Sequence, residues 1–106
     1  PDMASRKEIL KIHLSKMPVS ENVTVEWLAE ITENYSGADL ETLCREAGML
    51  ALRVHIRPGM SKEELILDDI MINEEHFKIA LERIKPHLSR EMLEEYTQMI
   101  RDFEVL

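Results

Sequence analysis

One local pattern recurs four times along this chain and constrains its fold more than any other feature. An apolar residue is followed directly by Thr, Ser or Asn, and a second apolar residue stands four positions after the polar one. This pattern is typical of a helix N-terminus, where the polar side chain caps the first turn and the two apolar side chains pack together. The four triplets are Val23, Thr24 and Leu28; Tyr35, Ser36 and Leu40; Ile72, Asn73 and Phe77; and Leu88, Ser89 and Leu93.

A fifth helical segment precedes these four. It begins near Asp2 or at Ser5, whose spacing to Glu8 offers an alternative capping box, and it ends before Pro18. The sequence therefore predicts an all-α fold, a small bundle of about five helices. Residues 65–67 and 70–72 allow short extended pieces between the third and fourth helices.

Apolar residues recur at helical spacing in every segment, so each predicted helix has one face to bury. The third segment carries the longest stripe, and we expect it to be the longest helix and the centre of the bundle. We interpret Met17, Met49, Met92 and Met99 as core filler rather than as an adaptable binding groove. The five stripes contain Ile9, Leu10, Ile12 and Met17; Trp27, Leu28 and Ile31; Leu40, Leu43, Cys44, Ala47, Leu50, Ala51 and Val54; Phe77, Ala80, Leu81 and Ile84; and Met92, Leu93, Tyr96, Met99, Ile100 and Phe103.

Composition limits the classes of function. The 106 residues, 44% of them apolar, suffice for one domain with a single small core. A net charge of −8 disfavours nucleic acid and anionic membranes as partners, because both attract clustered Lys and Arg. Cys44 is the single cysteine, which favours a reducing, cytoplasmic compartment. Since no apolar run approaches a membrane span, we expect protein partners.

The chain lacks the sequence signs of a catalytic phosphate site. Its three glycines, Gly37, Gly48 and Gly59, form no phosphate loop, so we expect no ATP hydrolysis by the chain alone. Asp68 and Asp69 follow an apolar run, but we interpret them as a solvated turn. His55, His76 and His87 have no metal-ligand spacing, and we expect them to have surface or capping roles.

The third predicted helix begins with an unusual pair of small residues. Ser36 and Asp39 have the spacing of a capping box, while Gly37 and Ala38 occupy the first turn between them. Neither small residue adds a capping group, but both leave the backbone open to close approach by a ligand base or ribose. Ordinary helix-start chemistry accounts for the same pattern, so the turn alone does not decide the function.

A second candidate contact lies on the first helix. His13 follows Ile9 by one turn, so their side chains project from the same face. Imidazole can exchange a hydrogen bond with a ribose hydroxyl, and an isoleucine can form an apolar wall for adenine. A histidine in such a position is, taken alone, more often a packed or surface residue.

The ordered set of segments adds a family resemblance. Residues 1–13, residues 23–32, the run from Ser36 to Leu40, residues 77–81, residues 86–89 and Tyr96 together resemble the small helical lid subdomain of classical AAA ATPases, most of all the Cdc48 branch. The resemblance implies that residues 1–106 are the C-terminal lid, that the large phosphate-loop subdomain is absent, and that Pro1 lies at the hinge between the two.

The resemblance also implies site residues and partners. In similar lids, the residues matching Ile9, His13, Gly37 and Ala38 contact the adenine and ribose of ATP or ADP, and Mg²⁺ is bound by the other subdomain. Broader relatives carry an arginine near Ala38 that reaches the γ-phosphate, so this lid is expected to sense the base and ribose. The parent is expected to be an ATP hydrolase, a homo-hexamer that unfolds protein substrates and whose neighbouring protomers respond to nucleotide state.

His87 stands where relatives usually have Ser, and this departure leaves the branch open. If Leu106 is the natural end of the protein, Val105 stands where proteasomal ATPases have a penultimate tyrosine, which disfavours the proteasomal branch. An alternative function also stays open, namely an independent acidic helical adaptor that binds a protein partner and has no nucleotide role. A nucleic-acid-binding helical domain is disfavoured by the charge.

Overall fold

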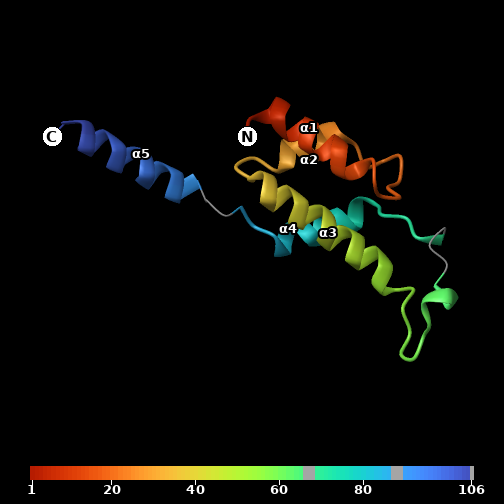
Figure 1. Cartoon of the computed structure of the whole chain (residues 1–106). Coiled ribbons are helices and arrows are strands. Elements are labelled where there is room, and N and C mark those ends of the chain that lie inside the picture. The colour runs from red at the N-terminus through yellow and green to blue at the C-terminus, as the bar shows by residue number, and fades with distance from the viewer. Residues whose placement is uncertain (66–68, 87–89, 106) are drawn as a thin grey trace.

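The computed structural model describes residues 1–65, 69–86 and 90–105, and it confirms the predicted all-α fold (Figure 1). Five α-helices occur within these ranges, with one short 3₁₀ turn and no strand. The elements are α1 (Met3–Leu14), α2 (Val25–Ile31), α3 (Gly37–Arg53), η1 (Lys62–Glu64), α4 (Glu74–Arg83) and α5 (Arg90–Val105).

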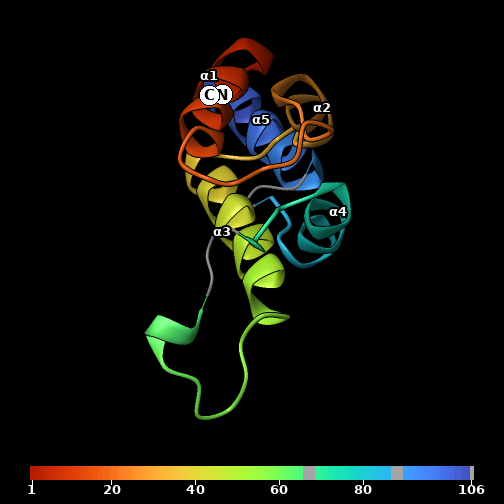
Figure 2. The same cartoon turned by 90° about the vertical axis from the view of Figure 1, so that its right-hand side faces the viewer.

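Helix α3 forms the centre of the packed part of the molecule, as expected. Helix α1 packs against both α2 and α3, while α4 packs against α3 (Figure 2). The side chains that are completely enclosed come from all four of these helices, so one continuous core holds them together. The largest of these enclosed apolar side chains are Leu10, Leu28, Leu40, Leu43 and Phe77.

Helix α5 extends away from this core. It packs against none of the other helices in the described part of the chain, and the molecule is accordingly elongated, with extents of 65 × 28 × 19 Å (Figure 1). The predicted apolar stripe of α5 is therefore largely exposed, from 40% for Met92 to 80% for Phe103, while Leu93 is half-buried. No helix among the described residues has the length and apolar character needed to cross a membrane.

The helix starts follow the predicted capping pattern. Thr24 accepts a hydrogen bond from the Trp27 N–H, and both Ser36 and Asn73 form reciprocal capping boxes. In the Asn73 box, His76 Nδ1 accepts from the Asn73 N–H at 3.0 Å, so His76 has the capping role expected for it. The alternative start at Ser5 is wrong, because Asp2 caps α1 by accepting from the Ser5 N–H.

Several predicted core positions are exposed instead. Ile12 is 56% exposed because the buried face of α1 runs through Leu10 and Leu14, on the opposite side of the helix. Val54 is 79% exposed because it caps the C-terminal end of α3, and Ile31 is 36% exposed at the end of α2.

The four methionines that we interpreted as core filler also differ in their burial. Met17 packs against the core, as predicted. The interpretation of the other three as core filler is wrong, since Met49 is 43%, Met92 40% and Met99 63% exposed. For the two on α5 the reason is that this helix has no helical partner among the described residues.

Among the described residues, the expected extended segment before α4 contributes one isolated bridge. Ile72 pairs in parallel with Val19: the Ile72 N–H donates to Pro18 O, and the Ser20 N–H donates to Ile72 O, both at 2.8 Å. The loop after α1 is thereby tied to the start of α4. Our expectations for residues 66–68, which include Asp68, and for residues 87–89, which include His87 and the cap Ser89, lie outside the described residues.

Candidate functional site

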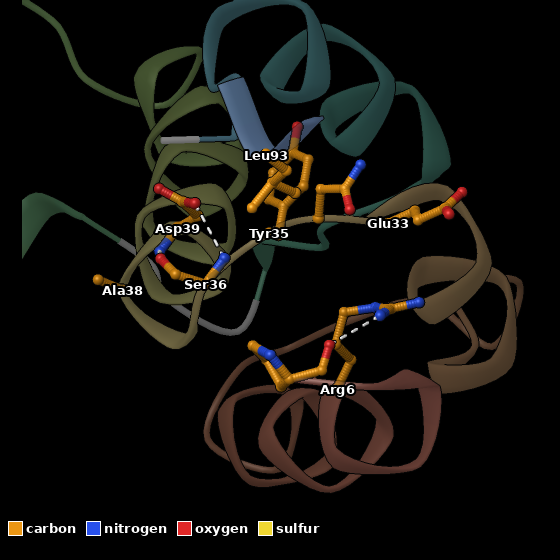
Figure 3. Close-up of a pocket in the computed structure, with 9 residues that line it drawn as sticks. Arg6, Glu33, Tyr35, Ser36, Ala38, Asp39 and Leu93 are labelled. Carbon is orange, nitrogen blue, oxygen red and sulfur yellow. Dashed lines mark hydrogen bonds between the residues drawn. The ribbon is translucent and has the colours of Figure 1, made fainter. Parts of the chain in front are cut away.

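The first turn of α3 is held by the capping box that the sequence predicts. The Asp39 N–H donates to Ser36 Oγ at 3.0 Å, and the Ser36 N–H donates to the Asp39 carboxylate at 2.9 Å (Figure 3). Asp39 is only 5% exposed, so this pair is well shielded. Gly37 and Ala38 are the first two helical residues, whose N–H groups point along the helix axis with no intrahelical acceptor. The turn is thus a rigid stretch of accessible backbone.

Helix α1 covers one side of this turn. A Cβ built on Gly37 would lie 3.9 Å from Ile9 Cδ1, although the two residues belong to different helices. His13 is half-buried and follows Ile9 by one turn of α1. The structure therefore brings Ile9 and Gly37 together, with His13 further along the same helix.

Ala38 lies on the other side of the turn. It is exposed and lines a cavity of about 640 Å³ between the start of α1, the loop before α3 and the start of α5 (Figure 3). Of the four predicted residues, Ala38 is thus the one that faces this second space. The cavity is lined by Pro1, Arg6, Glu33, Asn34, Tyr35, Ser36, Ala38, Asp39 and Leu93.

Arg6 is a residue that the sequence interpretation did not identify. Its side chain is 5% exposed, and its guanidinium donates to Ala29 O from Nε at 3.3 Å and from Nη2 at 3.0 Å. Nη1 donates to Pro1 O at 3.0 Å. A signal was present in the sequence, since Arg6, Ile9 and His13 have the i, i+3, i+7 spacing of one helix face.

Tyr35 connects the same turn to α4. Its hydroxyl donates to Ile84 O, the carbonyl of the residue that caps the C-terminal end of α4. Burial raises the pKa of the Tyr35 phenol, and the nearby Asp39 carboxylate raises it further. The phenol is therefore a protonated donor throughout the physiological pH range.

Neither a metal-ligand cluster nor an activated cysteine occurs among the described residues. No group of three or more His, Cys, Asp or Glu side chains is placed to hold a metal ion within these residues. Cys44 is buried in the core, and this burial raises the pKa of its thiol to about 12, so it is a neutral thiol at physiological pH. Beside Gly37, the Ile9 side chain forms an apolar wall next to open backbone, an arrangement that suits a planar ring.

Comparisons with known proteins point to one family. The model of the AAA+ lid domain matches residues 22–66. The cell division cycle protein 48 homolog of Archaeoglobus fulgidus is 49% identical over 105 residues, which are 97% of this chain and 14% of that protein. The chain therefore spans about one seventh of the length of this relative.

Solved structures share the fold. The FIGL-1 AAA domain in complex with ADP superimposes with a TM-score of 0.75 at 29% identity, covering 97% of this chain and 35% of that one. A structure concerning katanin self-assembly superimposes with a TM-score of 0.74 at 28% identity, covering 87% of this chain and 34% of the other. The chain thus belongs to the AAA+ lid domain family, and along almost its whole length it is similar to Cdc48-like ATPases.

Proposed function

We propose that residues 1–106 form the C-terminal lid of an ATP hydrolase whose large subdomain carries the phosphate loop. In this proposal Ile9 and His13 on α1, with Gly37 and Ala38 on α3, contact the adenine and ribose of ATP or ADP. The lid moves about the hinge at Pro1 as the nucleotide changes. The chain alone provides only part of the pocket and does not hydrolyse ATP.

The observation that carries this proposal is the approach of Ile9 to Gly37. An isoleucine side chain lies at van der Waals distance from the position that a Cβ on Gly37 would occupy. An apolar side chain beside exposed backbone forms one wall of a slot for a flat ring, and glycine keeps that slot open. The FIGL-1 AAA domain, which has the same fold over this region, was solved in complex with ADP.

The exposed face of α5 supports protein partners. Tyr96, Met99, Ile100 and Phe103 are each at least half exposed and follow one another at helical spacing. A contiguous apolar stripe of this kind is typical of a protein interface. We assign it to contacts with the large subdomain of the same protein or with a neighbouring protomer of a homo-hexamer, and the katanin structure concerns self-assembly of that relative.

The remaining parts of the proposal follow from the parent enzyme. In this proposal the Mg²⁺ of such an ATPase is bound by its large subdomain. A change in the bound nucleotide moves the lid and thereby affects the neighbouring protomer. The parent enzyme uses ATP hydrolysis to unfold protein substrates in the cytoplasm. The alternative, an acidic adaptor without a nucleotide role, would use the same α5 face.

The native gene provides the first test. The proposal requires a phosphate loop about 150 to 200 residues upstream of Pro1, a distance set by ordinary domain size.

The full-length protein should bind fluorescent mant-ADP, and replacing His13 by Ala should weaken binding about tenfold. A gene without that loop, or a full-length protein that does not bind mant-ADP, supports the adaptor instead, while equal affinity of the wild-type and His13→Ala proteins contradicts the proposed nucleotide contact of the lid. In a phosphate-release assay, the 106-residue chain should give no turnover above buffer.

A further inference from the structure

Arg6 is a buried cation whose partners are backbone carbonyls. Three of its hydrogen bonds run to Ala29 O and Pro1 O at 3.0 to 3.3 Å, and Nη2 also contacts Met3 Sδ at 3.7 Å. Figure 3 draws the Arg6 side chain with its bond to the first residue as a dashed line. A charged group that is 5% exposed is costly unless its donors are paired, so these bonds define one side-chain geometry.

The two carbonyls that Arg6 contacts belong to two different elements. Ala29 is in the last turn of α2, where carbonyls lack an intrahelical donor and carry the negative end of the helix dipole. The guanidinium therefore caps α2 from α1. Pro1 is the residue at which the chain enters α1, so the same side chain also holds the segment that we assign to the hinge.

Arg6 also lies on the face of α1 that carries the proposed nucleotide contacts. Residues 6, 9 and 13 have i, i+3, i+7 spacing, and rotation of α1 about its axis moves all three together. Holding Arg6 on the end of α2 therefore fixes the direction in which Ile9 and His13 project. Ile9 is then held against the first turn of α3.

We propose that Arg6 is a positioning residue for nucleotide recognition, which it serves by locking the rotation of α1 between the hinge and the C-terminal end of α2. This inference rests on the proposed function. Arginine is required because its planar fork reaches two separate carbonyls with three N–H groups, whereas a lysine ammonium is a compact donor that reaches one of them.

The test compares two replacements in the full-length protein. Arg6→Met keeps much of the apolar stem and removes every donor, while Arg6→Lys keeps the charge. We expect the dissociation constant for mant-ADP to rise about tenfold in the first variant and roughly threefold in the second. Arg45→Met is the matched control, because Arg45 is exposed and pairs only with Glu41 on its own helix among the bonds described, and its affinity should stay within about twofold of wild type.

The dissociation constant for mant-ADP and the number of binding sites per protomer distinguish a positioning role of Arg6 from a merely structural one. A variant that only unfolds part of the protein lowers the number of sites per protomer and leaves the dissociation constant of the remaining sites unchanged. That result, or unchanged affinity with full occupancy in both Arg6 variants, overturns the Arg6 inference. It leaves the proposed function standing if His13→Ala still weakens binding, whereas equal binding by His13→Ala and wild type removes both.

A second measurement covers the case in which Arg6→Met does not fold. In the 106-residue chain with Arg6→Lys, we expect the nuclear Overhauser effect between the Ile9 δ-methyl group and the Gly37 α-protons to weaken at least twofold, while the signals that link α3 and α4 within the core persist. An unchanged Ile9–Gly37 signal shows that α1 keeps its rotation without the guanidinium, and this contradicts the inference.

Discussion

Ile9 on α1 and Gly37 on α3 face each other so closely that a Cβ on Gly37 would lie 3.9 Å from Ile9 Cδ1. The distance is that of an ordinary van der Waals contact, so the fold itself does not require glycine at this position. A residue that folding does not require and that keeps a slot open is a good candidate for a ligand contact.

Gly37→Ala should separate binding from folding. The added methyl group fits beside Ile9, so the melting temperature should stay within about 2 °C of wild type, given that 1 kcal/mol shifts a domain of this size by about 4–8 °C. The same methyl group narrows the slot, and the dissociation constant of the full-length protein for mant-ADP should rise about tenfold. Wild-type affinity in a folded Gly37→Ala protein would remove Gly37 from the site.

Gly48→Ala is a control for glycine replacement in the same helix. A Cβ there would lie 3.4 Å from Met17 Cε and 3.8 Å from Ile72 Cδ1, and the nearer atom is the end of a flexible side chain. Because Ala is preferred over Gly inside a helix by about 1 kcal/mol, we expect a gain of roughly 0.5–1 kcal/mol in the free energy of unfolding. Urea denaturation measures it, and a loss of stability would show that Met17 cannot move.

Tyr35→Phe should remove the hydroxyl bond to Ile84 O and destabilise the fold by about 1 kcal/mol. Tyr96→Phe is the matched control, since Tyr96 is 50% exposed on α5 and should change stability very little. Equal denaturation midpoints for the two variants would contradict a structural role for the Tyr35 hydroxyl.

Tyr35 should also make the free energy of unfolding depend on pH. Because the pKa of Tyr35 is raised above 10.0 in the folded state, the folded protein holds this proton more tightly than the unfolded chain does. The resulting stabilisation is fully present below the unfolded-state pKa of 10.0, and it is lost as the pH rises through the higher pKa of the folded state. Wild type should therefore lose more stability between pH 9 and pH 11 than Tyr35→Phe, as measured by urea denaturation, and parallel profiles would contradict this.

Cys44 should be unreactive in the folded protein. Its thiol has a pKa of about 12 and is buried, so thiolate is scarce at pH 8 and reagents cannot reach it. Labelling by a thiol reagent such as DTNB should be slow without denaturant and fast in urea. Rapid labelling of folded protein, with unchanged circular dichroism, would show that α3 is less well packed than described.

The sequence predicted the fold well where the structure depends on interactions between residues close together in the chain. The caps at Thr24, Ser36 and Asn73 involve bonds between residues three positions apart, and all three are present. The burial of residues at the edge of each apolar stripe was less predictable, because it depends on which neighbouring helix packs over them. Val54 lies at the exposed end of α3, and α5 packs on no other helix among the described residues, which helical periodicity alone does not reveal.

The candidate site was predictable in part for the same reason. The Ser36–Asp39 turn and the common face of Ile9 and His13 follow from spacing along the chain. Arg6 was missed because a charged residue on a helix normally faces solvent, and its partner Ala29 lies 23 positions away. Burial of such a residue depends on the packing of α1 on α2, which the sequence does not specify by any local pattern.

The most direct test of the account is a structure of the full-length protein with bound ADP. The account predicts that the adenine ring lies within about 4 Å of Ile9 Cδ1 and of the Gly37 backbone, with His13 within hydrogen-bond reach of the ribose. A nucleotide bound elsewhere, or bound by the large subdomain with none of these residues in contact, would contradict it.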